Sequence, residues 1–298
     1  MKNLTIILLF LLMTLVVHGR QPVDPDTVWK FEGVTSLNFS QLSLSNWAAG
    51  GENSLSGNAL VKLSADYDNG ITAWDNDLAM GFGLIKQGDS PARKSDDQLE
   101  LSSKIGYRAS ERWNYSGLLS FRTQFAEGYD RPGEEDRIKI SNFMAPAYLN
   151  LSAGFDFRPN DRFSMLIAPL SGKVTFVLDE DLSDEGSFGL DPGQQIRGEF
   201  GGYIKVNFKQ EILTNVLLDT KIDLFSNYLE NPRYVDVNWD LLLTFKVNEF
   251  LSASLLTQLI YDRDIEFDVD TTGDGVPDST ESRVQFKELL GVGLTYSF

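Results

Sequence analysis

The sequence predicts an all-β chain that closes into a twelve-stranded antiparallel transmembrane β-barrel. Apolar residues recur at every second position over long segments, which is the period of a strand with two unlike faces. The polar breaks between these segments alternate between short and long, as in a barrel with tight turns at one end and extended loops at the other. After residue 19, no apolar run is long enough for a membrane helix. A membrane-spanning chain of this kind must satisfy its backbone hydrogen bonds between strands.

The N-terminus carries the features of a secretory signal peptide. Lys2 precedes an apolar run over 4–17, and Val17-His18-Gly19 offers a cleavage site. The run is shorter than the roughly 20 apolar residues of a membrane anchor. We therefore expect residues 1–19 to be a cleaved signal peptide, 20–28 to be a short lead-in, and 29–298 to form a single barrel domain.

Breaks in the alternation divide the chain into twelve strand segments. Short turns are predicted at 68–70, 110–112, 158–161, 209–211 and 247–249, and long polar loops at 46–53, 87–97, 127–140, 179–194, 227–233 and 264–282. This count places both chain ends on the side of the short turns. Short periplasmic turns and long external loops are typical of outer-membrane barrels, so we expect the outer membrane of a Gram-negative bacterium as the location.

The individual segments support a membrane barrel over a soluble sandwich, whose strands would also alternate. Alternation is clear over 55–67, 113–125 and 234–247, and these runs exceed the five or six residues usual in globular sheets. Aromatic residues lie near the predicted strand ends, where they favour the headgroup level, although ordinary packing gives the same pattern. These are Trp29, Trp47, Trp74, Trp113, Tyr129, Tyr228, Tyr261 and Phe298.

The last segment, 288–298, has apolar residues at Leu290, Val292, Leu294, Tyr296 and Phe298, alternating with mostly small or polar ones. It resembles the terminal strand of bacterial outer-membrane β-barrels, which closes on an aromatic residue. The resemblance implies that the barrel assembly machinery binds the strand of Phe298, and that outer-membrane lipid and lipopolysaccharide surround the protein.

A second resemblance rests on the run Asn46-Trp47-Ala48-Ala49-Gly50-Gly51-Glu52-Asn53, which follows the first strand. With the Asp-rich last loop and the closing strand, this signature resembles a family of Bacteroidota proteins catalogued as domain of unknown function 3078, over about 28–298. The resemblance implies an outer-membrane β-barrel and no particular activity. Gly50 and Gly51 also permit a tight external turn.

Several classes of chemistry are excluded by composition. The chain contains no Cys, and its one His, His18, lies in the predicted signal peptide. This removes the nucleophile–His pairs of common hydrolases and the usual zinc, copper and haem ligands. We therefore expect a protein that is not an enzyme, with no firm cofactor. The formal net charge of -17 argues against nucleic acid as a partner.

One loop has the spacing of a calcium site. Asp270, Thr272, Asp274, the Val276 carbonyl, Asp278 and Glu281 occupy positions 1, 3, 5, 7, 9 and 12 of the EF-hand loop pattern, with Gly275 at the sharp turn. Asp268 is an additional candidate ligand. Thr272 stands where Asp or Asn is usual, and no flanking helices are predicted. The alternative is a solvated acidic turn.

The face assigned to the lumen carries charges of both signs. The candidate selectivity residues are Asp219, Asp223, Asp236, Asp240, Lys62 and Arg122, accompanied by Asp66, Lys104, Lys205, Lys221 and Lys246. Such a face lines a narrow water-filled pore or forms ion pairs that plug it. The four aspartates fall on neighbouring ninth and tenth strands, which favours cations.

These observations predict a narrow channel for small hydrophilic solutes or cations. The alternative is a structural or binding barrel whose acidic external loops, around 127–136 and 179–185, hold calcium and contact lipopolysaccharide or partners.

Overall fold

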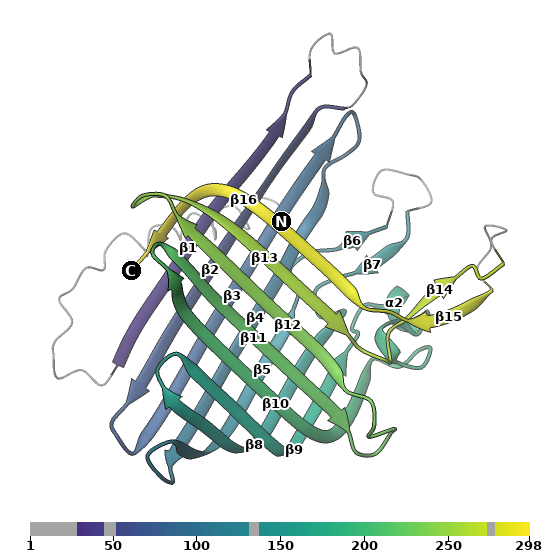
Figure 1. Ribbon diagram of the computed structural model, residues 1–298. Helices are drawn as coiled ribbons and strands as arrows, with labels where there is room; N and C mark the ends of the chain where they lie inside the picture. The colour runs from purple at the N-terminus through teal and green to yellow at the C-terminus, as the bar shows by residue number, and fades with distance from the viewer. Residues whose placement is uncertain (1–28, 45–51, 131–136, 273–277) are drawn as a thin grey trace.

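The computed structural model describes residues 29–44, 52–130, 137–272 and 278–298. The predicted signal peptide, the lead-in and most of the Asn46–Asn53 motif lie outside the described residues. Within them, twelve strands form one closed antiparallel barrel, which confirms the predicted fold class (Figure 1). The barrel strands are β1 (Trp29–Leu42), β2 (Ser54–Asp68), β3 (Thr72–Gln87), β4 (Arg93–Arg108), β5 (Trp113–Thr123), β8 (Ala147–Asn160), β9 (Phe163–Phe176), β10 (Ile196–Leu213), β11 (Val216–Asn227), β12 (Asp236–Lys246), β13 (Leu251–Tyr261) and β16 (Gln285–Ser297).

Each barrel strand pairs with the barrel strands before and after it, and β1 pairs with β16 to close the ring. The longer connections carry small elements of their own. These are the strand pairs β6 (Gly128–Tyr129) with β7 (Lys139–Ser141) and β14 (Glu266–Val269) with β15 (Ser279–Ser282), the helix α2 (Glu180–Asp184) and the 3-10 turn η1 (Ser187–Gly189). They lie at one end of the barrel, opposite the tight turns (Figure 1). Among the described residues, no helix is long and apolar enough to cross a membrane.

One predicted turn was wrong. The sequence analysis placed a turn at 209–211, but β10 continues to Leu213 and pairs there with Val216. The reversal occurs instead at Asn215, whose φ of 65° lies in the left-handed region. Asn tolerates that conformation better than most residues. Lys209 and Glu211 are polar because they lie near a strand end, where a polar run alone does not mark the turn.

One long loop is also shorter than predicted. The sequence analysis expected a loop over 87–97, but β3 runs to Gln87 and β4 already begins at Arg93. The polar residues at the start of β4 have partners in the folded barrel: Asp96 pairs with Lys287 inside it, and Asp97 pairs with Lys94 and accepts hydrogen bonds from the backbone of Phe125 and Ala126. A polar segment within a lumen-facing strand therefore resembled a loop.

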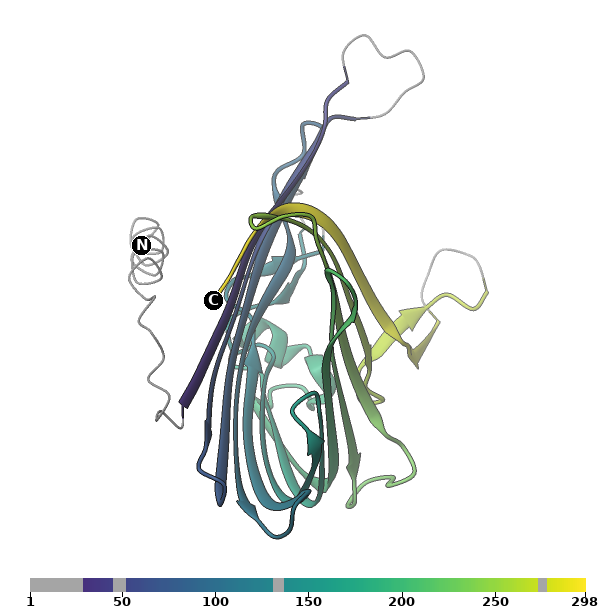
Figure 2. The same cartoon turned by 60° about the vertical axis from the view of Figure 1, so that its left-hand side comes forward.

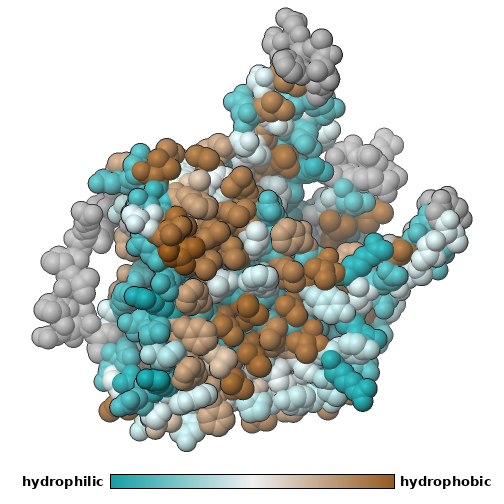
Figure 3. Space-filling view, viewed as in Figure 1, coloured by the Kyte–Doolittle hydropathy of each residue, from teal (hydrophilic) through white to brown (hydrophobic). Residues whose placement is uncertain are grey.

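The two faces of the barrel wall differ in polarity. Apolar side chains exposed on the outside include Leu151, Leu170, Leu290 and Leu294. Figure 3 shows such residues spread over the visible outer face of the barrel. The inside is mainly polar and charged, but it also holds a buried apolar cluster of Leu118, Leu166, Ala168, Tyr203 and Phe225, drawn from β5, β9, β10 and β11. Side chains of β5, β9, β10 and β11 thus fill part of the barrel interior.

The loops at the long-loop end pack on one another. Ala145, Val177, Leu182 and Leu190 form a second buried apolar cluster, which joins the β5–β8 connection to the β9–β10 connection. Lys139 adds ion pairs to Asp179 at 2.9 Å and to Asp181 at 2.6 Å. The two connections therefore form one folded cap.

Candidate functional site

The lumen is crossed by an ion pair between strands that are not neighbours. Nζ of Lys62 on β2 lies 2.9 Å from Oδ2 of Asp219 on β11. On the shorter way round the barrel, β1, β16, β13 and β12 lie between these two strands. Both side chains therefore point into the barrel and meet across it.

A second ion pair crosses the lumen and is more buried. Lys221 on β11 donates to Glu100 on β4, with β5, β8, β9 and β10 between the two strands. Lys221 also lies 3.3 Å from Asp240 of the adjacent strand β12. Its side chain is 20% exposed, and those of Glu100 and Asp240 are 12% and 26% exposed. One lysine thus holds carboxylates of two opposite walls together.

Near the tight turns, a cluster of four charges links β3, β4 and β8. Lys104 lies 2.9 Å from Asp156 and 3.6 Å from Asp75. Arg158 pairs with the same two carboxylates, at 3.3 Å from Asp156 and also with Asp75. Two cations and two anions balance here, so burial leaves no uncompensated charge.

At the end with the long loops, Lys173 forms the centre of a mouth cluster. It lies 2.8 Å from Asp236, 3.3 Å from Asp262 and 3.5 Å from Glu199. Arg197 pairs with Glu199 at 3.0 Å. A small cavity of about 40 Å³ adjoins this cluster. Its lining consists of Glu199, Asn227, Glu230, Asn231, Tyr234, Asp236, Arg263 and Asp264.

Each of the four predicted selectivity aspartates contacts a lysine in the structure. The pairs are Asp219 with Lys62, Asp223 with Lys205, Asp236 with Lys173, and Asp240 with Lys221. Asp223 also accepts a hydrogen bond from the Tyr203 hydroxyl, and Asp240 accepts one from Gln258 at 2.6 Å. The structure thus distributes these aspartates among ion pairs, and cation selectivity stays a prediction.

Arg122 lies in register between Glu100 of β4 and Tyr148 of β8. It faces the same inner surface as Glu100, beside the Lys221–Glu100 pair. The structure therefore places two cations, Lys221 and Arg122, around one buried glutamate.

Several interior residues that matter here were missed by the sequence analysis. Glu100, Asp75, Asp156 and Lys173 all form cross-strand ion pairs. Their signal was present, because each is a polar residue on the polar face of an alternating segment. Their ion-pair partners could not be predicted from the sequence, because pairing across a lumen depends on how the sheet curves.

The predicted calcium loop is described only in part. Asp274, Gly275 and Val276 lie outside the described residues. Oδ1 of Asp278 accepts hydrogen bonds from the backbone N–H and the hydroxyl of Thr271 at 3.0 and 2.8 Å. Glu281 lies in β15 opposite Phe267, and Thr272 donates to Asp270. No group of three metal-ligating side chains is found among the residues that the structure describes, and calcium binding stays a prediction.

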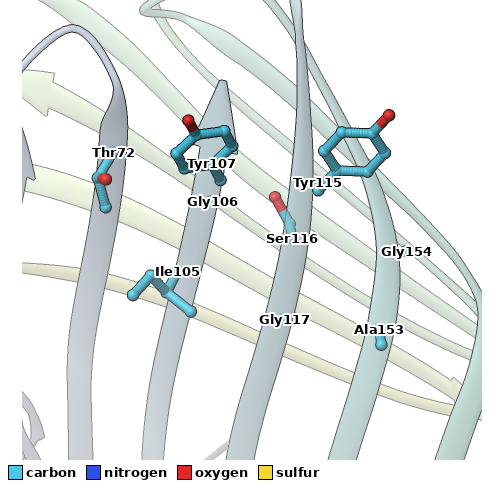
Figure 4. A pocket seen from close by; sticks show the side chains of 9 residues that line it. All are labelled: Thr72, Ile105, Gly106, Tyr107, Tyr115, Ser116, Gly117, Ala153 and Gly154. Carbon is cyan, nitrogen blue, oxygen red and sulfur yellow. The ribbon is translucent and has the colours of Figure 1, made fainter. Parts of the chain in front are cut away.

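The outer surface carries a hollow of about 490 Å³ near the tight turns (Figure 4). Tyr107 and Tyr115 project from neighbouring strands over it, and Gly106, Gly117 and Gly154 leave the backbone open between them. Tyr107 and Tyr115 are both exposed. The hollow is a shallow, mainly apolar depression of the wall and offers few polar groups to a ligand.

Comparisons with known proteins concern the family and the fold. A family model described as a protein of unknown function, DUF3078, matches residues 39–129. This segment includes the Asn46–Asn53 motif, so the resemblance to that family is supported there, while an origin in Bacteroidota stays a prediction. No curated protein matches the chain.

Among solved structures, the similar ones are outer-membrane barrels. The translocator domain of the autotransporter NalP from Neisseria meningitidis has a TM-score of 0.40 and 10% identity, covering 100% of this chain and 96% of that one. An outer membrane channel from Pseudomonas putida F1 has a TM-score of 0.39 and 10% identity, covering 93% and 100%. Outer membrane phospholipase A from Escherichia coli has a TM-score of 0.33 and 11% identity, covering 93% and 94%. These likenesses are too distant to indicate an activity.

Proposed function

We propose that the chain is an outer-membrane β-barrel of a Gram-negative bacterium that conducts small ions and hydrophilic solutes through a narrow lumen. Support for the membrane comes from the outer face, where Leu151, Leu170, Leu290 and Leu294 are 58–70% exposed. Water makes an exposed apolar wall of this kind costly, whereas lipid accommodates it. The barrel also has tight turns at one end and long loops at the other, as outer-membrane barrels do.

An aromatic group at the tight-turn end supports the same placement. The Trp29 ring lies 5.2 Å from that of Tyr67 and 5.7 Å from that of Trp74. Farther round the barrel, Trp113 lies 4.9 Å from Phe157. Such rings are favoured at the level of lipid headgroups, so we infer that this end lies at a membrane interface, and its tight turns favour the periplasmic one.

The observation that carries the channel proposal is that the side chains that cross the lumen here, Lys221 and Glu100, are polar and not apolar. It marks a polar constriction, where an ion can replace one partner of an ion pair without entering an apolar layer. The crossing between Lys62 and Asp219 forms a second constriction. A conducting path through this barrel must pass both pairs, so conductance is small and depends on them.

The second candidate is a structural or binding barrel with a closed lumen. The buried cluster of Leu118, Leu166 and Phe225 favours it, because these side chains fill part of the interior. Its external loops would then bind divalent cations that bridge lipopolysaccharide, as the acidic sequence predicts. In neither case do we assign a catalytic residue.

Single-channel recording in planar bilayers separates the two candidates. The channel predicts small discrete steps for the natural protein and larger steps for the double variant Lys221→Gln/Glu100→Gln, which loses the more buried crossing. Glu249→Gln changes an acid in a tight turn and serves as the matched control. Folding is confirmed by heat-modifiable gel mobility. Silence from both folded proteins would refute the channel and support the closed barrel.

A further inference from the structure

The seam that closes the barrel is paired over only part of its length. β1 pairs with β16 from Val34 with Ser297 to Asn38 with Gly293. Gly33 and Phe298 extend the seam by two mutual backbone hydrogen bonds of 3.0 Å. Beyond Asn38, β1 continues to Leu42 and remains paired with β2 alone. Figures 1 and 2 show β1 and β2 continuing past the barrel while β16 bends away from them.

The hydrogen bonds of the seam reveal which backbone groups this divergence leaves at the edge. Phe298 directs its N–H and C=O to β1, and Thr295 directs its N–H to Phe250 on the β13 side. Successive residues of a strand direct their backbone N–H and C=O groups to opposite sides. The backbone groups of the even-numbered residues of β16 therefore point toward β1. Phe286, Glu288 and Leu290 therefore present backbone groups that no strand pairs within the part of the chain that the structure describes.

An ion pair holds β16 in this position from the inside. Lys287 of β16 lies 2.9 Å from Asp96 of β4, although β1, β2 and β3 separate these strands in the barrel order. The pair links the loop-side half of β16, where it is no longer paired with β1, to β4. The edge is therefore open toward the outside of the barrel, while side chains close its inner side.

The side chains along the edge are suited to a particular partner. Phe286, Leu290 and Val292 are 63%, 70% and 56% exposed, and Glu288 is an exposed acid among them. An outward-facing carboxylate on the wall of a membrane barrel is costly unless a cation approaches it. The order apolar, acidic, apolar, apolar complements a strand that is apolar at alternate positions and carries one basic residue.

We propose that the loop-side edge of β16, at Phe286–Val292, is a docking site for an extended segment of a partner protein, with a basic residue opposite Glu288. Main-chain hydrogen bonds supply the binding energy in such strand addition, and alternate side chains supply the specificity. Lipid chains cannot satisfy the free N–H and C=O groups, whereas a strand can. The proposal needs the barrel wall but not a conducting lumen.

The test uses the full chain folded in detergent and two short labelled peptides of alternating Val and Thr, one with Arg and one with Glu at the centre. Fluorescence anisotropy measures binding. We expect the Arg peptide to bind more tightly than the Glu peptide by about tenfold or more, and Glu288→Arg to reverse this preference. Glu249→Arg, in a tight turn, should leave the preference unchanged.

Leu290→Pro tests the backbone directly. The backbone N–H of Leu290 faces the open edge. Proline at this position therefore removes a free donor without breaking the hydrogen bonds between β16 and β13. We expect this variant, if heat-modifiable mobility shows it folded, to bind both peptides more weakly. If it does not fold, hydrogen exchange of the natural protein replaces it, and the Arg peptide should slow exchange at 286–292. Equal binding of both peptides by all folded variants would overturn the proposal. The proposal would also be overturned if the natural protein bound neither peptide but formed a dimer that Leu290→Pro dissociates. The edge would then bind a second copy of this chain.

Discussion

Lys62 of β2 and Asp219 of β11 lie 2.9 Å apart, although four other strands separate them round the barrel. Because the two strands come from distant parts of the sequence, this contact follows from the curvature and closure of the sheet. Both side chains are about one-third exposed, at 34% and 32%. Solvent therefore screens the pair, so its contribution to stability is small, and in the proposed channel its larger role is to restrict the lumen.

Asp219→Asn should lower the free energy of unfolding by roughly 1 kcal/mol or less, as expected for a partly solvated pair. The same change frees Lys62 and should raise single-channel conductance. Urea unfolding in lipid vesicles and planar-bilayer recording measure the two effects. A loss of stability as large as that expected for Lys221 would contradict this division of roles.

Lys221→Met should destabilise the barrel much more, by about 3–5 kcal/mol, because Glu100 and Asp240 lose the lysine that lies between them. Lys221→Met combined with Glu100→Gln should recover part of the loss, since it removes one of the uncompensated charges. Urea unfolding of the two single variants and the double variant forms a complete cycle. Additive losses would show that the pair is not coupled.

Asn215 should tolerate Gly but not Val. Its φ of 65° is accessible to glycine, whereas a β-branched residue pays about 1–2 kcal/mol there. The backbone N–H of Asn215 donates to Glu211 at 2.8 Å and would remain in both variants. Unfolding midpoints of Asn215→Gly and Asn215→Val provide the comparison. Equal midpoints would place the reversal of the chain elsewhere.

The loop cap should loosen at acidic pH. Burial alone would raise the pKa of Asp179, but hydrogen bonds from Asn142, Lys139 and the Leu182 backbone lower the pKa below its usual value. A lowered pKa in the folded state contributes stability above the unfolded pKa, and this contribution is lost as pH falls through the folded pKa. Hydrogen bonds to Asp181 and Asp179 raise the pKa of Lys139, so its contribution is lost only at strongly basic pH.

Hydrogen exchange at 139–145 as a function of pH measures this effect. We expect protection at neutral pH, a loss of protection in acid, and weak dependence on acid in Asp179→Asn. Asp184→Asn is the control, because Asp184 is an exposed acid at the end of α2, the helix that Asp179 precedes. The same acid dependence in all three proteins would assign the loosening to other groups.

Calcium should bind the loop at 270–281 weakly, with a dissociation constant of about 10⁻⁴–10⁻³ M, as in extracellular modules. Asp274→Ala should abolish binding. Asp278→Ala should weaken it, although the Asp278 carboxylate also holds Thr271. Isothermal titration of the folded protein with calcium chloride measures both effects, and unchanged heats in Asp274→Ala would identify a solvated acidic turn.

The alternation of apolar and polar residues was sufficient to predict the number of strands and the direction of their side chains, because both are local properties. The turn at Asn215 was missed because Lys209 and Glu211 are polar although they belong to the end of β10 and not to the turn. The partners of Lys62 and Lys221 could not be predicted at all. They depend on the closure and shape of the ring, which bring β2 and β4 against β11.

The pairing of Gly33 with Phe298 has a kinetic consequence. Every other contact between neighbouring strands of the ring joins segments that follow one another, so each can form early and cheaply as a hairpin. The last contact must wait for both ends of the sheet to meet, and it pays the largest loop-closure entropy. The Phe298 ring occupies the space that a Cβ on Gly33 would take, so a side chain there would require the ring to move. We therefore expect the pairing of β1 with β16 to form last during folding and to separate first on heating.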